Sequence, residues 1–393
     1  MKMKRQKNHA SKIFAMIFFL ICVVAMGCGN ESGANKIGGN EANRAEEKSL
    51  SIDERVEKIL SSMTLTEKIG QLVMIGVQGT EPNADSLYML HQFHFGGVIL
   101  FDRNMESAAQ VRRLTRGLDE GADEKLPMFF ALDEEGGDVV RMSDALTPPP
   151  SEAELGARGD SEAVHDWAKK TGASLKEMGI NVNFAPVVDV ATDASFDTRS
   201  YSRDAHEVAR LADAAARGYE DAGVFYALKH FPGIGRGAVD SHREISSIDA
   251  TKDELMAQDL VPYREVFARH ASDELNYFVL VSHLLYPALD DENGASLSHA
   301  VMTGLLRNEL GYRGLIVTDD MEMGAVQNHH TFREVGAKAI EAGADIVLVC
   351  HEYEHEEDVY MGILDAVKRG EIKEERIDES VRRIIKAKLL HLK

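Results

Sequence analysis

The apolar and polar positions from Ile52 onward alternate between two kinds of segment. Short continuous apolar runs, rich in β-branched residues, are separated by longer stretches whose apolar residues recur at helical spacing. Strands that are buried on both faces give such runs, and their alternation with helices is typical of a parallel sheet covered by helices. The expected strands are Gln71–Val77, Gly97–Phe101, Met128–Leu132, Asn181–Val187, Val224–Leu228, Tyr277–Val281, Leu315–Thr318 and Asp345–Val349.

The stretches between these strands have the pattern of amphipathic helices. Eight strand–helix units in about 300 residues fit a closed (β/α)8 barrel better than an open sheet. No composition typical of a linker interrupts residues 51–393, so one barrel domain is predicted there. The expected helices include Glu106–Asp119, Ser161–Met178, Ala205–Ala222, Lys252–Arg269, Ala300–Glu309 and Thr331–Ala342.

The N-terminal residues have a different composition. Basic residues precede a short apolar run, Ile13–Met26, which is followed by Gly27 and Cys28. This order is typical of an export signal, and the run is too short to cross a hydrocarbon core of roughly 30 Å comfortably. The segment Ala25–Cys28 resembles a bacterial lipoprotein signal, although Ala25 stands where Leu is commoner. The resemblance implies lipidation of Cys28, with plain secretion or a retained anchor as alternatives.

Residues 28–50 are rich in Asn, Glu, Gly and Ala and lack apolar periodicity, which predicts a flexible tether. The expected organisation is therefore a signal peptide at 1–27, a tether at 28–50 and a barrel at 51–393. An exported protein, lipid-anchored on the outer face of the bacterial cytoplasmic membrane, is the localisation that this order predicts.

The composition narrows the function further. The chain has 393 residues and a formal net charge of −21, which repels nucleic acid phosphates and argues against a general DNA- or RNA-binding role. Three cysteines cannot build a disulfide framework. Cys350 ends an apolar strand and is expected to be an inert, buried thiol.

Chemically active residue types follow six of the expected strands within two residues. Active sites of (β/α)8 barrels lie at the carboxyl ends of the strands, so these positions are expected to share one site, although some polar residues there would only cap the next helix. They are Asp133, Asp189, Lys229 with His230, His283, Asp319 and His351.

The densest chemistry lies between Lys229 and His242, in the sequence KHFPGIGRGAVDSH. Together with the segments Asp133–Gly137, Arg199–Ser202 and Val317–Met321, it resembles glycoside hydrolase family 3. The branch that it resembles is that of the bacterial β-N-acetylglucosaminidases that trim peptidoglycan fragments. The resemblance runs from about Met63 to the C-terminus and implies a (β/α)8 barrel, in agreement with the strand count.

The resemblance also implies a role for each motif residue. Asp319 corresponds to the nucleophile, and Asp240 and His242 correspond to an acid/base dyad. The implied activity is that of a retaining exo-β-N-acetylglucosaminidase, which forms a covalent glycosyl–Asp319 intermediate on GlcNAc-containing muropeptides and needs no metal or organic cofactor. The implied sugar contacts are Asp133, Arg141, Arg199, Lys229 and His230.

The residue types suit this chemistry. Retaining glycosidases place a carboxylate on one side of the anomeric carbon and an acid on the other. A histidine, with a pKa of roughly 6.5, can donate and accept a proton near neutral pH, and a carboxylate such as Asp240 can orient its ring. Glycines in the loop, among them Gly233, are expected to let His242 swing over the sugar as a lid. Taken alone, His242 would be a solvated loop residue.

Several residues keep a structural alternative. Lys229 can pair with Asp133 alone, and Arg141 and Arg199 can form surface salt bridges instead of offering their planar donor forks to a sugar. Asp320 can turn outward or cap the next helix. For His283, packing and substrate contact are both open. Trp167 falls in an expected helix and is expected to pack between that helix and the barrel.

The chain departs from the family pattern at three positions. Ile234 and Arg236 stand in a segment that usually has the sequence Gly-His-Gly-Asp, and Asp138 stands where Arg is usual. These changes leave substrate choice and rate open.

Other functions remain as alternatives. His351, Glu352 and His355 match the HExxH pattern of zinc peptidases, but they follow a strand directly instead of lying within a long helix. A phosphorylase is a variant of the leading hypothesis, because an imidazole repels phosphate less than a carboxylate does. The loop departures motivate a third alternative, a sugar-binding lipoprotein without turnover.

Overall fold

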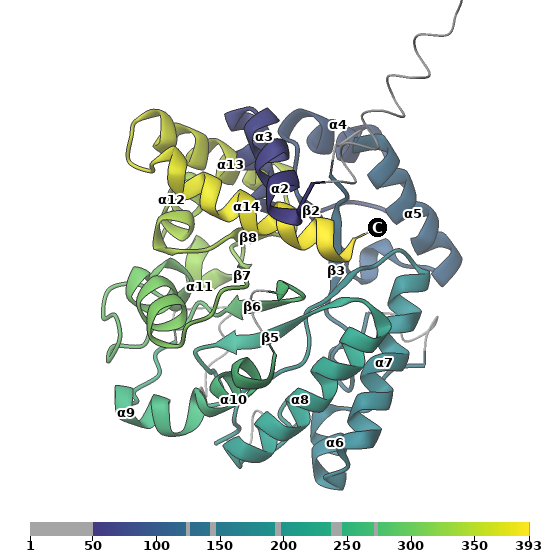
Figure 1. Cartoon of the computed structure of the whole chain (residues 1–393), viewed down its shortest axis with the longest axis vertical. Coiled ribbons are helices and arrows are strands. Elements are labelled where there is room, and N and C mark those ends of the chain that lie inside the picture. Colours follow the sequence, from purple (N-terminus) through teal and green to yellow (C-terminus); the bar gives the residue numbers. More distant parts are fainter. Residues whose placement is uncertain are drawn as a thin grey trace, which may run out of the picture. The chain divides into compact units, whose positions relative to one another are not determined.

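Eight parallel strands close into a barrel in the computed structural model, and helices surround it (Figure 1). Each strand pairs with the next one in sequence, and β8 pairs with β1 to close the ring. The eight expected strands are therefore confirmed, and so is the (β/α)8 fold. The strands are β1 (Val73–Gly76), β2 (Gly97–Ile99), β3 (Phe129–Leu132), β4 (Val182–Asn183), β5 (Phe225–Phe231), β6 (Tyr277–Val281), β7 (Leu315–Asp320) and β8 (Ile346–Val349).

The structure describes residues 50–122, 126–141, 147–192, 198–236, 246–270 and 274–392. The predictions for the signal peptide, for Cys28 and for most of the tether lie outside these residues. Asp240 and His242, the predicted acid/base dyad, also lie outside them. Within the described residues, no helix combines the length and the apolar character needed to cross a membrane.

Most of the expected helices lie where the sequence pattern predicts them. The helices are α2 (Ile52–Ser62), α3 (Leu65–Gln71), α4 (Ala84–Phe93), α5 (Ala108–Ala122), α6 (Glu152–Arg158), α7 (Ser161–Glu177), α8 (Ala205–Ala222), α9 (Lys252–Glu254), α10 (Val261–Arg269), α11 (Gly324–Gln327), α12 (Phe332–Ala342), α13 (Tyr353–Lys368) and α14 (Glu374–His391). Short 3-10 turns are η1 (Asp102–Asn104) and η5 (Ala295–Leu297), and π-helical segments are η3 (Leu255–Asp259) and η6 (Ala300–Glu309).

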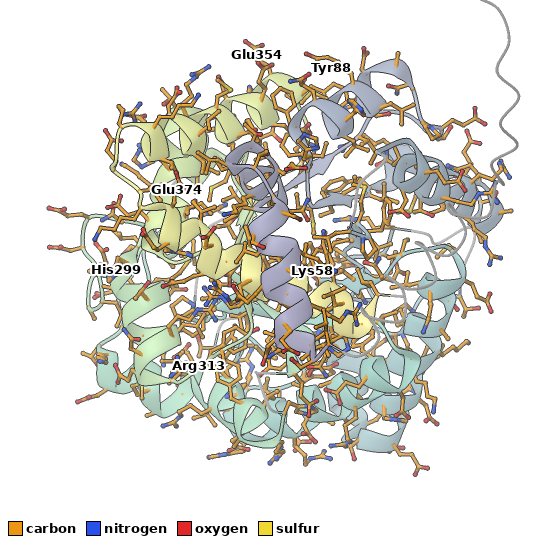
Figure 2. All side chains as sticks on the ribbon, turned by 45° about the horizontal axis from the view of Figure 1, so that its top comes forward. Lys58, Tyr88, His299, Arg313, Glu354 and Glu374 are labelled. Carbon is orange, nitrogen blue, oxygen red and sulfur yellow. The ribbon has the colours of Figure 1, made fainter. Side chains whose placement is uncertain are left out.

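The continuous apolar runs follow from burial on both faces of each strand. In β3, Phe129 and Ala131 belong to the cluster inside the barrel, whereas Phe130 and Leu132 belong to the cluster between the barrel and the helices. Successive side chains of a strand point to opposite faces, so both sets must be apolar. Charged side chains such as Lys58 and Glu374 point outward from the helical shell (Figure 2).

Two local predictions are wrong. The expected single helix Lys252–Arg269 is divided into α9, η3 and α10, and Pro262 at the start of α10 has no backbone N–H to continue the preceding helical ladder. Strand β5 extends to Phe231 and strand β7 to Asp320, so Lys229, His230 and Asp319 belong to the strands instead of following them. The last residue of β5 pairs with Val281 of β6 after a shift in register.

Helix α14 closes the amino-terminal end of the barrel. Ile384 and Ala387 of this helix belong to the cluster inside the barrel. The buried Nζ of Lys388 donates hydrogen bonds to Gln71 Oε1 at 2.7 Å and to the carbonyl of Gly96 at 2.8 Å. With this end filled, the opposite end of the barrel is left to form a cavity.

Candidate active site

A cavity of about 450 Å³ opens at the carboxyl ends of the strands. Asp319, near the end of β7, lines it together with Lys229 of β5. Strands β5 and β7 are separated only by β6, and side chains from alternate strands of a closed barrel can point to a common centre in this way. The expected nucleophile therefore lies inside the cavity and not on the outer helical shell.

One carboxylate oxygen of Asp319 is bound by the backbone, and the side chain lines the cavity. Its Oδ1 accepts a hydrogen bond from the backbone N–H of Asp320 at 2.9 Å. Both aspartates are partly exposed where β7 ends, and both line the cavity. Asp319 can thus present a carboxylate oxygen to a ligand from a rigid strand end.

Lys229 lies at the centre of a buried charge network. Its Nζ lies 2.8 Å from Asp133 Oδ1 and 2.6 Å from Glu135 Oε1. Arg199 binds Glu135 with two nitrogens, Nε at 2.9 Å and Nη2 at 2.8 Å. Arg141 Nη2 reaches Asp133 Oδ2 at 3.2 Å. Four of the predicted sugar contacts are thereby linked, and all of them line the cavity.

The network fixes the charge of its members. Burial alone would raise the pKa of Asp133, but the charges of Lys229 and Arg141 more than offset it and hold that pKa below its usual value. Burial likewise opposes the charge of Lys229, but the two carboxylates beside it raise its pKa. The pKa of Glu135 is lowered far below its usual value in spite of its burial, chiefly by Lys229 and Arg199. The ion pairs therefore stay charged at neutral pH.

His230 is oriented from below by Asp189. Its Nδ1 lies 2.7 Å from Asp189 Oδ2, and its backbone N–H donates to the same carboxylate. The other ring nitrogen, Nε2, lies 3.4 Å from Arg199 Nη2, and both residues line the cavity. The fifth residue predicted to contact the sugar thus also lines the cavity, and Asp189 fixes the orientation of its ring.

The segment that leads to the predicted dyad is firmly attached to the barrel. The backbone N–H of Ile234 donates to Asp189 Oδ1 at 2.8 Å, and Tyr286 donates to the carbonyl of Gly233 at 2.9 Å. Arg236 Nε binds both oxygens of the buried Asp259, at 3.0 and 2.8 Å. The departure at Arg236 therefore has a partner in the structure, and Ile234 lines the cavity. Asp138, the third departure, is exposed.

The HExxH pattern does not form a zinc site among the described residues. His351 follows β8 and contacts Asp320, whereas His355 lies on α13, binds Glu322 Oε1 through Nδ1 at 2.6 Å and stacks on Phe332. Glu352 is an exposed residue at the start of α13. Because the two histidines have different partners, the zinc peptidase alternative loses its structural basis.

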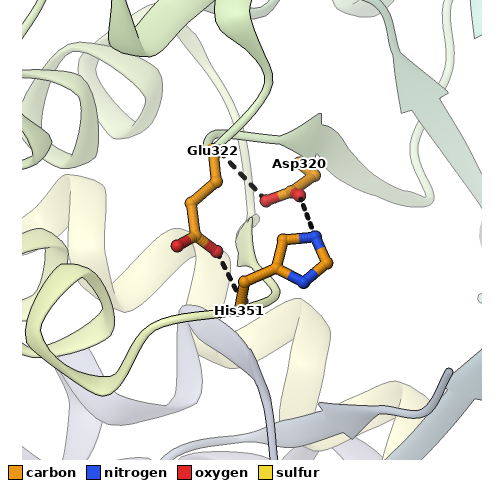
Figure 3. Close-up of side chains that lie close together, drawn as sticks. All are labelled: Asp320, Glu322 and His351. Carbon is orange, nitrogen blue, oxygen red and sulfur yellow. Dashed lines mark hydrogen bonds and ion pairs between the residues drawn. The ribbon is translucent and has the colours of Figure 1, made fainter. Parts of the chain in front are cut away.

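Asp320, Glu322 and His351 lie close together, with potential ligand atoms within 4.8 Å of one another (Figure 3). The carboxylate of Glu322 is already used: it accepts hydrogen bonds from the backbone N–H groups of Cys350, His351 and Glu352 at the start of α13. An acid at a helix N-terminus is a common structural device. This cluster is therefore accounted for without a metal ion.

The remaining structural alternatives are resolved residue by residue. Asp320 neither turns outward nor caps a helix with its side chain, because its Oδ2 binds His351 and it lines the cavity. His283 is buried, bound to Ser296 and to the carbonyl of Asp320, so it supports the site by packing. Trp167, on α7, packs against the hydrophobic core as expected. Cys350 is a buried free thiol whose pKa is raised by burial.

Sequence reasoning missed Glu135 and Glu152. Glu135 lies two residues after Asp133, but only the fold shows that its carboxylate separates Lys229 from Arg199. Glu152 is buried behind this network, where burial and the charge of Glu135 raise its pKa well above the usual value. Its Oε1 accepts a hydrogen bond from the backbone N–H of Val187 at 2.8 Å. A charged residue at the start of a helix gave no signal that distinguished it from a surface cap.

A closed (β/α)8 barrel whose cavity is lined by a strand-end carboxylate and a buried lysine–carboxylate–arginine network has the layout of a barrel-enzyme active site. The known proteins that this chain resembles specify the family. A model of the glycosyl hydrolase family 3 N-terminal domain matches residues 64–387.

The individual relatives agree. The chain is 34% identical over 328 residues to β-hexosaminidase A of Pseudoalteromonas piscicida, a match that covers 76% of this chain and 54% of that protein. It is 34% identical over 336 residues to β-hexosaminidase LpqI of Mycobacterium tuberculosis, with 81% of each chain covered. The solved structure of a glycoside hydrolase family 3 β-N-acetylglucosaminidase from Paenibacillus sp. FPU-7 matches with a TM-score of 0.81 at 40% identity, covering 84% of this chain and 63% of that one.

This chain therefore belongs to glycosyl hydrolase family 3, and the resemblance inferred from its motifs is confirmed. It spans about half the length of the Pseudoalteromonas relative and less than two thirds of the Paenibacillus structure.

Proposed function

We propose that the chain is a retaining exo-β-N-acetylglucosaminidase that removes terminal β-linked GlcNAc from a glycoside. The observation that carries this proposal is the placement of Asp319 in the same cavity as the buried pair Lys229–Asp133. The relatives named as β-hexosaminidases and the structure named as a β-N-acetylglucosaminidase support the choice of sugar. Muropeptides derived from peptidoglycan are the proposed source of the glycoside.

The described residues would hold the terminal sugar in a defined orientation. The ammonium of Lys229 and the guanidinium groups of Arg141 and Arg199 offer charged donors to sugar hydroxyls, and Asp133 offers an acceptor. This arrangement presents the anomeric carbon to Asp319.

The reaction then proceeds in two displacements. Asp319 attacks the anomeric carbon while the bond from that carbon to the leaving oxygen breaks, and His242 donates a proton to this oxygen. Asp240 stabilises the imidazolium before transfer and the imidazole after it. In the second step His242 takes a proton from water, the water oxygen bonds to the anomeric carbon, and Asp319 leaves as a carboxylate.

Release of nitrophenol from 4-nitrophenyl β-GlcNAc tests the activity. The wild-type chain is expected to release it without any effect of a chelator, and Asp319→Ala is expected to lower kcat by at least about 10³-fold. Mass spectrometry after reaction with a slow 5-fluoro glycoside should show a sugar adduct on Asp319. Sugar binding without any turnover would contradict the proposal and favour the non-catalytic lipoprotein.

Added phosphate distinguishes hydrolysis from the phosphorylase variant. A hydrolase yields free GlcNAc whether phosphate is present or not, because water is the acceptor. Accumulation of GlcNAc-1-phosphate instead would replace the hydrolase with the phosphorylase while keeping Asp319 as the nucleophile.

We further propose export and lipid anchoring through Cys28, which the sequence of residues 1–28 supports. Metabolic labelling with a fatty acid, followed by fractionation, tests this. The wild-type protein should carry the label and sediment with membranes, and Cys28→Ser should lose the label. A membrane-bound Cys28→Ser protein would instead favour a retained N-terminal anchor.

A further inference from the structure

The cavity has an inner part and an outer part that differ in burial. In the inner part the side chains of Lys229 and Glu135 are only 3% and 2% exposed. In the outer part the side chain of His351 is 46% exposed, and Phe101 beside it is partly exposed. If the terminal sugar occupies the inner part, as the proposed function requires, the leaving group lies on the outer side of Asp319.

His351 stands on this outer side because of its place in the barrel. It follows β8, which pairs with β7, and its ring points toward Asp320, the neighbour of Asp319 (Figure 3). Nε2 of the ring lies 3.2 Å from Asp320 Oδ2, and Nδ1 lies 3.1 Å from Arg103 Nη1. Both nitrogens are thus occupied, and what the ring offers a ligand is carbon.

Phe101, which follows β2, extends the same surface. Its ring centroid lies 5.2 Å from that of His351, with 36° between the ring planes. The guanidinium groups of Arg103 and Arg141 lie 4.7 and 5.5 Å from the centre of the Phe101 ring, and Arg103 also donates to the carbonyls of Val77 and Cys350. These contacts hold both rings in place before a ligand binds.

We propose that Phe101 and His351 form the aglycone subsite, a two-ring platform on which a second pyranose ring stacks its C–H face. The platform lines the same cavity as Asp319, and the apolar side chain of Met323 lines that cavity as well. Stacking on fixed rings favours a flat, ring-shaped leaving group over a small alkyl one. The inference rests on the proposed function and adds a preference for sugar aglycones. It also gives a role to the first histidine of the HExxH pattern.

Two substrates that share the terminal sugar test the platform. One is the disaccharide GlcNAc-β-1,4-GlcNAc, and the other is methyl β-GlcNAc, which has no ring in its aglycone. His351→Ala should lower kcat/KM for the disaccharide by about tenfold and for the methyl glycoside by less than about twofold. Equal losses on both substrates, or no loss on the disaccharide, would overturn the proposal.

Two further variants separate the ring from its hydrogen bonds. His351→Phe keeps a ring and loses the contact with Asp320, so it should retain kcat/KM for the disaccharide within about threefold of wild type. His351→Gln keeps a polar group for Asp320 without a ring and should behave like His351→Ala. The reverse order would show that His351 acts on Asp319 through Asp320, which would overturn the platform.

His355→Ala is the matched control. His355 also stacks on a phenylalanine, Phe332, at 3.9 Å between ring centroids, but neither residue lines the cavity. Among the described residues, His355 contacts the site only through Glu322, so its loss removes no ring from the platform and should affect both substrates alike. A selective loss for the disaccharide would mean that the effect of His351→Ala is not specific to the platform.

Failure of the proposed function gives a different result. If the wild-type chain turns over neither glycoside, the glycosidase proposal fails and the platform is tested by binding. Calorimetry in an Asp319→Ala background should then show that His351→Ala weakens binding of the disaccharide about tenfold and leaves that of GlcNAc unchanged. Equal weakening of both sugars would overturn the platform.

Discussion

Glu135 is the residue through which the two cations of the inner cavity are joined. Its side chain is 2% exposed and lies between Lys229 and Arg199, with hydrogen-bond distances of 2.6 to 2.9 Å. A buried ion pair contributes little net free energy when it is intact, but breaking one partner leaves an uncompensated charge. The position of this carboxylate therefore controls both the stability of the network and the placement of Lys229 and Arg199 in the cavity.

Glu135→Gln is expected to damage both properties. The amide is isosteric but cannot neutralise two buried cations, so the free energy of unfolding should fall by about 3 kcal/mol. Since Lys229 and Arg199 lose their common anchor, kcat/KM should fall by about 100-fold or more. Urea unfolding and steady-state kinetics measure the two effects. Glu207→Gln, which changes a carboxylate in a surface pair with Arg210, is the control and should leave kcat/KM unchanged. A Glu135→Gln protein with wild-type kcat/KM would contradict the network.

At the scale of residues, the sequence predicted which side chains line the cavity better than it predicted which ion pairs they form. Asp319, Lys229, His230 and the two arginines were found because the motifs carry them, and all of them line the cavity. The link between Lys229 and Glu135 joins residues 94 positions apart, and no local pattern encodes which buried acid meets which base. The exposure of His351 and Phe101 was equally hidden, because it depends on which strands are neighbours.

Among the elements, the stem Gly233–Arg236 and the π-helical segment η3 belong together. Asp259, at the end of η3, is buried beneath the stem, and only Arg236 offers it a cation within ion-pair distance among the described residues. Burial raises the pKa of Asp259 to about 6, against the opposing charge of Arg236. Asp259 is thus ionised at pH 8 and largely protonated at pH 5.

Arg236→Ala should consequently destabilise the protein in a pH-dependent way. At pH 8 the variant must bury an unpaired carboxylate or take up a proton, and the free energy of unfolding should fall by about 2 to 3 kcal/mol. At pH 5 Asp259 already carries a proton in the wild type, so the loss should be smaller. Urea unfolding at both pH values measures this. Arg210→Ala, which breaks a surface pair with Glu207, should cost less than about 1 kcal/mol at either pH.

The junction of α8 and α10 contains a second pH-dependent element. His270, at the end of α10, has Asp213 and Glu220 of α8 at its two ring nitrogens, at 3.1 and 2.8 Å. Burial opposes its charge, but the two carboxylates raise the pKa of His270 to about 9. Arg269 and Arg217 also approach Asp213, yet the imidazolium is the group that both acids share.

The sign of the resulting effect follows from the raised pKa. His270 is protonated in the folded protein up to about pH 9 and in the unfolded chain only up to about pH 6.5, so its contribution is complete below pH 6.5 and is lost as the pH rises to 9. The wild type should lose up to about 3 kcal/mol more than His270→Gln between pH 6 and pH 9. Equal slopes of stability against pH in the two proteins would contradict the ion triad.

Element positions followed from the sequence because their causes are local. Apolar runs gave the strands, and the helices Ser161–Glu177 and Ala205–Ala222 begin after aspartates that cap them. The division of 252–269 into α9, η3 and α10 was missed because its amphipathic pattern is that of one helix. The extension of β5 to Phe231 depends on pairing with β6, which is a property of the closed sheet.

At the scale of the whole barrel, the apolar core that stabilises the fold and the cavity with the candidate site lie at opposite ends of the barrel axis. Apolar side chains and α14 fill the amino-terminal end, whereas nearly all charged groups of the site lie at the carboxyl end. The number of strands and the place of the cavity were predictable, because a closed parallel barrel leaves few arrangements. The sequence did not predict that α14 fills the amino-terminal end of the barrel, because any of the surrounding amphipathic helices has a comparable apolar face.

This separation predicts that a core substitution at the amino-terminal end of the barrel lowers stability without changing turnover. Ile384 of α14 is fully buried inside the barrel, and Ile384→Ala removes three carbons there, so the free energy of unfolding should fall by about 2 to 4 kcal/mol. The cavity is lined from the other end of the strands, so kcat and KM of the folded enzyme should stay within about twofold of wild type. Asp319→Asn is the mirror control, expected to abolish turnover while it leaves the urea midpoint nearly unchanged. Both variants are measured by the same unfolding and rate assays. A tenfold loss of kcat in fully folded Ile384→Ala would contradict the prediction. It would show that the two ends of the barrel are mechanically coupled and that the core at the amino-terminal end helps to aim Asp319.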